Sequence, residues 1–147
     1  MAVRGDIEMY GEYEHTVDVK GRMNFPAKLR DEFGEHFYIC KSLNEKCLTV
    51  YTAERWEDLK ASLRGKPSKI AKPIERFLFG GSSEVEPDKQ GRIAIPSPLR
   101  DYANITSEVV VVGLGDGAEI WDKAAWEEYN SKTSLEYVSR LAEELGI

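Results

Sequence analysis

Two short segments of the chain combine aspartate, glycine and arginine at the same spacing. Residues 18–22 read Asp-Val-Lys-Gly-Arg, and residues 88–92, 70 positions later, read Asp-Lys-Gln-Gly-Arg. The glycine suits a turn with a positive φ, and the aspartate can accept hydrogen bonds from backbone N–H groups of that turn. The pattern predicts two turns that each project one arginine.

The 70-residue offset continues on both sides of these segments. The matched pairs are Gly11 and Gly81, Glu14 and Glu84, Pro26 and Pro96, Leu29 and Leu99, Arg30 and Arg100, Asp31 and Asp101, and Trp56 and Trp126. A single copy would be interpreted as a hairpin turn with a solvated arginine. Turn geometry does not require the further matches, so the chain is predicted to be a tandem repeat of units of about 50 residues that share a function and a core.

Each unit is expected to follow the order β-β-α-β-β. Alternation places Met23 and Phe25 on one face of their strand and Arg22 on the other, away from the core, and residues 92–95 repeat this arrangement. A proline then favours a first helical turn in each unit. The first unit is predicted to contain strands 13–18, 22–25, 37–40 and 48–51 and a helix at 26–33. The second is predicted to contain strands 83–86, 92–95, 109–112 and 118–121 and a helix from Pro96.

Helical segments are expected to follow each unit. A helix should begin after Thr52 and carry Trp56 and Leu63, followed by a linker at 65–68 and a short helix at 73–79. Two C-terminal helices are expected, and the last has an apolar stripe that should pack against the chain or a neighbouring subunit. The predicted division is 11–53 for the first repeat, 54–80 for the connecting helices and linker, 81–124 for the second repeat and 125–147 for the C-terminal helices.

The composition is typical of a globular protein of the cytoplasm. Of 147 residues, 41% are hydrophobic and 31% are charged, and no apolar run approaches the roughly 20 residues of a membrane span. Residues 1–8 lack the apolar segment of a signal peptide. Cys40 and Cys47 could face each other across a hairpin, but packed thiols are favoured in a reducing compartment. We expect no metal, no cofactor and no membrane partner.

The charge is unevenly distributed along the chain. The net charge of −6 argues against a wholly electrostatic DNA binder. Residues 64–76 carry five basic side chains against one acid, and residues 119–145 carry three against seven. The basic stretch is interpreted either as a solvated linker or as a phosphate-facing segment.

Catalytic chemistry finds little support in the sequence. His15 has no predictable serine or cysteine partner, and the carboxylates of Glu143 and Glu144 belong to a solvated helix. The glycines at 113, 115 and 117 lack the helix start and the lysine of a phosphate loop, so a hairpin turn is favoured. The chain is therefore predicted not to be an enzyme.

Four segments together closely resemble the MraZ family of bacterial transcriptional regulators. These are Gly-Glu-Tyr-Glu-His-Thr-Val-Asp-Val-Lys-Gly-Arg at 11–22, Pro-Ala-Lys-Leu-Arg at 26–30, Arg-Phe-Leu-Phe at 76–79 and Asp-Lys-Gln-Gly-Arg at 88–92. The resemblance extends from about Met9 to the C-terminus. One copy of the Asp-x-x-Gly-Arg motif would indicate only the broader AbrB-like group, whereas paired copies are specific to this family.

The resemblance implies an α+β fold in which two tandem AbrB-like swapped-hairpin units form a pseudo-two-fold, β-barrel-like core with peripheral helices. It also implies a ring homo-oligomer in the cytoplasm and nucleoid. This ring would bind double-stranded DNA at tandem G-rich promoter repeats upstream of the division and cell-wall gene cluster. The implied DNA-binding residues are Lys20, Arg22, Lys89 and Arg92, and the implied turn-shaping residues are Asp18, Gly21, Asp88 and Gly91.

Two positions on the arginine-bearing face depart from this family pattern. Asn24 stands where an apolar residue is expected, and Ala94 is small for its position.

Lys20 is better suited to a phosphate than to a base. The alternative function is a ring-forming interaction or scaffold protein whose arginine faces bind a protein partner.

Overall fold

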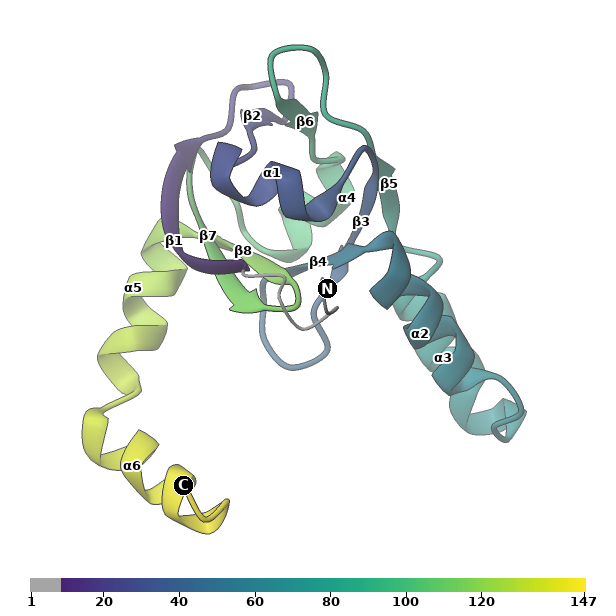
Figure 1. The fold of residues 1–147 in the computed structure, drawn as a ribbon, viewed down its shortest axis with the longest axis vertical. Coiled ribbons are helices and arrows are strands. Elements are labelled where there is room, and N and C mark those ends of the chain that lie inside the picture. The colour runs from purple at the N-terminus through teal and green to yellow at the C-terminus, as the bar shows by residue number, and fades with distance from the viewer. Residues whose placement is uncertain (1–8) are drawn as a thin grey trace, which may run out of the picture.

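The computed structural model describes residues 9–147 as an α+β fold (Figure 1). The first half contains β1 (Met9–Thr16), β2 (Arg22–Asn24), α1 (Ala27–Phe33), β3 (Phe37–Lys41), β4 (Leu48–Thr52), α2 (Ala53–Leu63) and α3 (Ser68–Leu78). The second half contains β5 (Ser83–Val85), β6 (Arg92–Ala94), α4 (Ser97–Tyr102), β7 (Glu108–Gly115), β8 (Ala118–Asp122), α5 (Lys123–Lys132) and α6 (Leu135–Glu144). Both halves therefore follow the same order, β-β-α-β-β and then two helices.

The two units exchange their first strands. The main sheet is antiparallel with the order β1-β7-β8-β4-β3-β5, so β1 of the first unit pairs with β7 of the second, and β5 pairs with β3. The hairpins β3-β4 and β7-β8 meet at the centre, where β4 pairs with β8. The remaining strands, β2 and β6, form a separate two-stranded ribbon with one strand from each unit (Figure 1).

Exchanging the two units leaves this strand order unchanged, so a pseudo-two-fold axis relates them. The axis passes through the ribbon as well, because Arg22 pairs with Ala94 and its counterpart Arg92 pairs with Asn24, the counterpart of Ala94. Neither unit can form its sheet alone, since each lacks the edge strand that the other supplies. The strands of the two units are therefore interleaved in one sheet.

The 70-residue offset does not hold for every element. Phe37 pairs with Thr52 in the first unit, and Val109 pairs with Asp122 in the second. Thr52 and Asp122 differ by 70 positions, but Phe37 and Val109 differ by 72. Two additional residues precede β7, and the turn between β7 and β8 is correspondingly shorter, with 114–117 in place of 42–47. The sequence repeat conceals this shift because the last strands return to the original offset.

One hydrophobic core joins the two units. The side chains of Met23, Phe25 and Phe37 from the first unit lie in the same cluster as Ile93 and Ile95 from the second, all with at most 2% exposure. The rings of Phe25 and Phe37 are 4.9 Å apart, which favours tight aromatic packing at the centre. Burial of these side chains fixes the register of the strands that carry them, because a slip by one residue would turn the apolar side chains to solvent.

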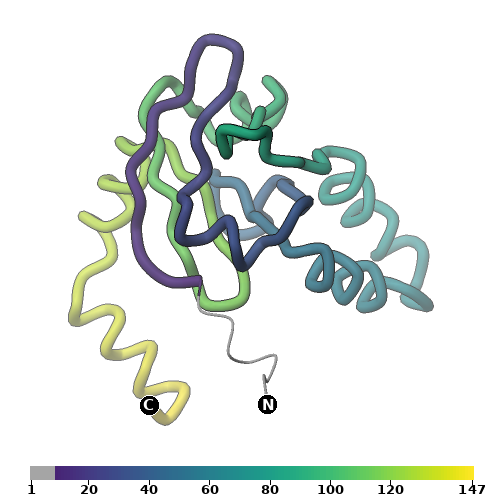
Figure 2. Tube along the Cα trace, turned by 45° about the horizontal axis from the view of Figure 1, so that its top comes forward, coloured from purple at the N-terminus to yellow at the C-terminus, as the bar shows by residue number. Residues whose placement is uncertain are grey.

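Two helical arms extend from opposite sides of the sheet. Figures 1 and 2 show α2 and α3 side by side in one arm, whereas α6 follows beyond the end of α5 in the other. Trp56 anchors the first arm by stacking on Tyr38 at 4.7 Å, and Trp126 donates a 3.0 Å hydrogen bond to Glu12 in the second. The matched tryptophans of the repeat therefore attach equivalent helices to the sheet.

The last helix leaves an apolar face exposed to solvent. Leu135 and Leu145 are 83% and 78% exposed, and no residue of α6 is buried. Ser134 caps the helix through its hydroxyl, which accepts a hydrogen bond from the N–H of Tyr137. The stripe predicted from the sequence thus does not pack against residues 9–147.

Several predicted boundaries were wrong. The linker was expected to include Ser68 and the next helix to begin at Pro73, but α3 begins at Ser68 after Pro67 and carries Pro73 in its interior. Pro73 lies in the second turn of α3 and lacks the N–H that would donate to the carbonyl of Lys69, so the helix continues through it with one hydrogen bond fewer. The first strand begins at Met9 and ends at Thr16, because β7 provides partners along all of that length.

Both cysteines are buried free thiols, as predicted. Cys40 packs beside Trp56 and Leu78, whereas Cys47 packs beside Trp121 in a different cluster. Burial raises the pKa of each thiol to about 12, so neither forms a thiolate near neutral pH.

No helix within residues 9–147 combines the length and the apolar character needed to cross a membrane.

Candidate nucleic-acid interface

The first turn is built around the carboxylate of Asp18. Its Oδ1 accepts hydrogen bonds from the backbone N–H groups of Lys20 and Arg22, both at 2.9 Å, and its Oδ2 lies 3.2 Å from Nε of Arg22. The backbone closes the same turn, because Gly21 donates to the carbonyl of Asp18 at 2.9 Å. Gly21 has a φ of +84°, which only glycine adopts without strain. One carboxylate therefore fixes both the turn and the base of the arginine side chain.

The second turn repeats this geometry. Asp88 Oδ1 accepts from the N–H groups of Gln90 and Arg92, both at 2.9 Å, and Oδ2 lies 2.9 Å from Nε of Arg92. Gly91 donates to the carbonyl of Asp88 at 2.9 Å and has a φ of +80°. The two turns are thus copies of one device in structure as well as in sequence.

Both arginines lie on the outer face of the ribbon. Met23 and Ile93 pair across the ribbon with their side chains in the core, which directs the alternate residues outward. The side chains of Arg22 and Arg92 are 42% and 38% exposed. Asp18 and Asp88 bind each guanidinium through Nε, so the terminal nitrogens remain available for a ligand on the outer side.

Hydrogen bonds between the units hold the two turns against each other. The N–H of Phe25 donates to the carbonyl of Gly91 at 3.0 Å, and the N–H of Ile95 donates to the carbonyl of Gly21 at 2.8 Å. Each glycine therefore receives a bond from the strand of the opposite unit. This reciprocal pairing makes the ribbon and its turns one rigid element, which Figure 1 shows at the end of the sheet remote from the tips of the arms.

The two lysines predicted to contact DNA occupy different positions in their turns. Lys20 corresponds to Gln90, and Lys89 corresponds to Val19, which is 95% exposed. Both lysines are exposed and lie beside the arginines. The structure therefore places all four predicted DNA-binding residues on one end of the molecule, with the lysines in a pattern that is not two-fold symmetric.

The electrostatics of this end differ from those of the whole chain. Residues 18–30 and 88–100 together carry seven basic side chains and two acidic ones, a net charge of +5 within a chain of −6. The hydrogen bond from the backbone N–H of Arg22 is the main cause that holds the pKa of Asp18 below its ordinary value. The backbone N–H of Arg92 lowers the pKa of Asp88 in the same way. Both carboxylates are therefore ionised and neutralise part of the arginine charge near neutral pH.

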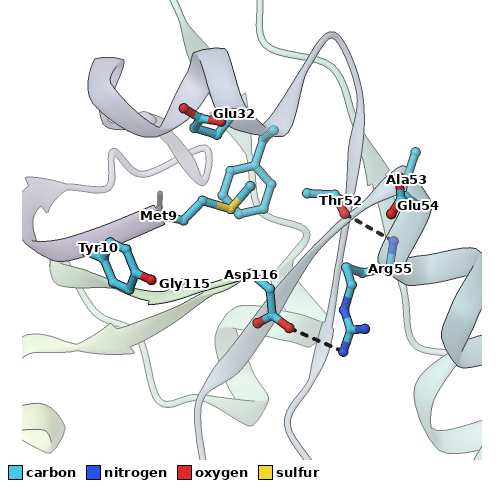
Figure 3. A pocket seen from close by; sticks show the side chains of 10 residues that line it. Met9, Tyr10, Glu32, Thr52, Ala53, Glu54, Arg55, Gly115 and Asp116 are labelled. Carbon is cyan, nitrogen blue, oxygen red and sulfur yellow. Dashed lines mark hydrogen bonds and ion pairs between the residues drawn. The ribbon is translucent and has the colours of Figure 1, made fainter. Parts of the chain in front are cut away.

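A separate cavity of about 530 Å³ lies at the other end of β1 (Figure 3). Met9, Glu32 and the start of α2 line it together with the turn between β7 and β8. Arg55 bridges the two sides, because its guanidinium lies 3.4 Å from Asp116 while its N–H donates to Thr52 Oγ1. The eight residues of β1 separate this cavity from the first turn, so the two sites are distinct.

Sequence reasoning overlooked two arginines that lie beneath the turns. Arg100 packs against Gly21, and Arg30 packs against Gly91, each from the unit opposite to its glycine. Their shared Leu-Arg-Asp context at the 70-residue offset was visible in the sequence. Nothing in that context indicated which turn either arginine would reach.

The interleaved fold and its paired arginine turns define a two-unit protein whose exposed ribbon suits an anionic partner. A family model described as "MraZ protein, putative antitoxin-like" matches residues 9–74 and 78–145. The chain belongs to the MraZ family.

Curated relatives extend over nearly the whole chain. A protein of Alkaliphilus oremlandii is 45% identical over 141 residues, which cover 93% of this chain and 98% of the relative. A protein of Acetivibrio thermocellus is 43% identical over 140 residues, covering 94% and 96%, and one of Moorella thermoacetica is 45% identical over 137 residues, covering 92% and 94%. All three are named "Transcriptional regulator MraZ".

Proposed function

We propose that this protein is a sequence-specific DNA-binding transcriptional regulator and not an enzyme. The observation that carries the proposal is the placement of Arg22 and Arg92 on the outer face of one rigid ribbon. The names of the relatives support a role in transcription. The reading residues are Arg22 and Arg92, with Lys20 and Lys89 on the phosphates and Asp18, Gly21, Asp88 and Gly91 shaping the turns.

The major groove of B-DNA is wide enough for a two-stranded ribbon. Arg22 and Arg92 are diagonal neighbours, so their Cα atoms are roughly 7–8 Å apart. That separation matches about two base steps of roughly 3.4 Å, so one ribbon can reach two nearby guanines. A bidentate contact to O6 and N7 contributes roughly 1–3 kcal/mol of discrimination against another base.

A single subunit is expected to bind weakly. The net charge of +5 at the ribbon end is offset by acidic residues elsewhere, which limits long-range attraction to DNA. Tight binding therefore requires several subunits on several sites, and we infer a ring homo-oligomer on tandem G-rich repeats. The exposed face of α6, with Leu135 and Leu145, supports self-association.

Family membership extends the proposal to the biological target. The two units are AbrB-like swapped hairpins in a barrel-like core, an assignment supported by the exchange of β1 and β5 between units. The DNA target is the promoter of the bacterial division and cell-wall gene cluster, and the protein acts in the cytoplasm on the nucleoid.

The experiment that tests this function begins with selection of bound fragments from the source genome, using the full chain. The selected duplex and a scrambled duplex of equal length are then titrated at several salt concentrations. Preferential binding to the selected duplex that weakens steeply as salt rises is the expected result. If no duplex is enriched or retarded, the ribbon serves a protein partner in a scaffold and the DNA proposal is wrong.

A further inference from the structure

Arg100 of the second unit supports the turn of the first. A Cβ added to Gly21 would lie 2.8 Å from Nε and 3.0 Å from Cζ of Arg100, so the guanidinium occupies the space that a side chain at this position would need. Arg100 Nε donates a 2.9 Å hydrogen bond to the carbonyl of Ile95. The carbonyl of Ile95 itself lies 2.6 Å from that Cβ position, so the guanidinium and the strand both press against Gly21.

Arg30 of the first unit supports the turn of the second in the same way. A Cβ on Gly91 would overlap a terminal nitrogen of Arg30 and would lie 2.5 Å from its Cζ. This arrangement is crosswise because Arg30, in the last turn of α1, and Arg100, in the last turn of α4, each reach the turn of the other unit. Gly21 and Gly91 are therefore needed both for their positive φ and for the approach of these guanidinium groups.

We propose that Arg100 and Arg30 are positioning residues that act across the units, Arg100 on the reading residue Arg22 and Arg30 on Arg92. This inference rests on the proposed DNA-binding function. Arg22 adjoins Gly21 and is bound to Asp18 through both its N–H and its Nε. A shift of the turn therefore moves the guanidinium of Arg22 with it. Contacts to bases tolerate little displacement, so a loosened turn loses specific affinity.

The two supports differ in how firmly they are anchored. Nε of Arg100 is hydrogen-bonded to Ile95, whereas Nε of Arg30 is buried without a hydrogen-bond partner in the described residues. A buried donor that lacks a partner holds its group less firmly and costs free energy. Loss of Arg100 should therefore weaken specific binding more than loss of Arg30.

Double-mutant cycles on DNA binding test the crosswise coupling. Arg100→Met retains an aliphatic chain but removes the guanidinium, and it should weaken specific binding about tenfold, within the range measured for residues in contact. In an Arg22→Ala background the same change should have almost no further effect, because the residue it positions is gone. In an Arg92→Ala background it should keep its full effect. Arg30→Met should have almost no further effect in the Arg92→Ala background and should keep its full effect in the Arg22→Ala background.

Direct contact of Arg100 and Arg30 with phosphate predicts a different outcome. Each change would then add to both Arg22→Ala and Arg92→Ala, and it would reduce the salt slope of binding. Additive effects in both backgrounds, or coupling within one unit, would overturn the proposal. Thermal unfolding of each variant identifies any general loss of the fold, and Arg100→Lys provides a milder second variant at the same site.

A measurement without DNA separates this inference from the proposed function. The Nε–Hε signals of Arg22 and Arg92 can be followed by NMR in the free protein. Arg100→Met should shift the signal of Arg22 and leave that of Arg92, and Arg30→Met should do the opposite. Equal shifts of both signals contradict the crosswise coupling. Failure of the wild-type protein to bind any duplex contradicts the function instead.

Discussion

Arg22 and Arg92 are diagonal neighbours on one face of a single ribbon, although 70 residues separate them in the chain. Ala94 is the direct partner of Arg22, and Asn24 is that of Arg92. Small or short polar partners leave both guanidinium groups room on the outer face. The surface proposed to read bases therefore belongs to neither unit alone, because each unit supplies one arginine and one strand of the ribbon.

Removal of a turn lysine should weaken binding to all sequences equally. Lys20→Ala and Lys89→Ala each remove one exposed positive charge beside the ribbon. Each change is expected to reduce the slope of log affinity against log salt by about 0.9 without altering the preference for the selected duplex.

Lys132→Ala is the matched control for the lysine variants. Lys132 is also exposed, but it pairs with Glu128 in α5, in the arm remote from the ribbon. Its loss should leave the salt slope unchanged. A change in base preference for Lys20→Ala, with the slope intact, would instead assign Lys20 to base reading.

The two turn carboxylates should titrate below the ordinary range of aspartate. Backbone hydrogen bonds lower the folded pKa of Asp18 and Asp88, so the stability they contribute is fully present above the unfolded pKa of about 3.9. That stability is lost as the pH falls through the lower folded pKa. Carboxyl chemical shifts from pH 7 to pH 2 should therefore show both groups titrating late.

Asp18→Asn provides the corresponding stability measurement. The variant should melt below the wild type at pH 7, and the difference should disappear at a pH below the folded pKa, where the wild-type group is protonated. A difference in melting temperature that persists unchanged through the acid range would show that ionisation of Asp18 contributes nothing to the turn.

The ribbon should depend on its two buried residues for stability. Met23 and Ile93 pair across the ribbon and are each 2% exposed. Met23→Ala or Ile93→Ala should lower the free energy of unfolding by about 2–5 kcal/mol, because each leaves a cavity in the shared core. Asn24→Ala, on the exposed face of the same strand, should change it by less than about 0.5 kcal/mol. Denaturant unfolding measures all three, and equal values for Met23 and Asn24 would contradict the assigned strand faces.

The order of the helices and strands, and the outward direction of Arg22 and Arg92, could be predicted from the sequence. Strand alternation around Met23 and the Asp-x-x-Gly-Arg turns depends on neighbours within a few residues, which local physics decides. The start of α3 was mispredicted because Pro73 was interpreted as a helix start, whereas the helix begins five residues earlier and continues through this proline.

The particular residue contacts between the two units could not be predicted from the sequence. The pairing of Arg22 with Ala94 and the contact of Arg100 with Gly21 depend on how the two units dock. The same limit applies to the 72-residue offset of β7, since only its pairing with β8 reveals the two-residue shift. A repeat indicates that two units exist, but long-range packing determines which side chain of one unit meets which turn of the other.

The phase of the DNA repeats should matter if several subunits bind at once. Adjacent repeats on one face of the duplex, spaced near about 10 base pairs, can be bound together, and linkage then raises affinity by roughly 10²–10⁴. Inserting about five base pairs turns one repeat to the far side. We expect this insertion to weaken binding nearly as much as deletion of the repeat. Equal affinity for both spacings, measured by anisotropy with the same assembled protein, would refute multivalent binding.

The central claim is that Arg22 and Arg92 read bases from the ribbon. The most direct test measures the affinity of the double variant Arg22→Ala/Arg92→Ala for the selected duplex and for a scrambled duplex, alongside the wild type. Two bidentate contacts of roughly 1–3 kcal/mol each predict a loss of at least about 30-fold on the selected duplex, down to the affinity for the scrambled one. Circular dichroism should show an intact fold, because both side chains lie outside the core. Unchanged preference for the selected duplex in the folded double variant would contradict the account.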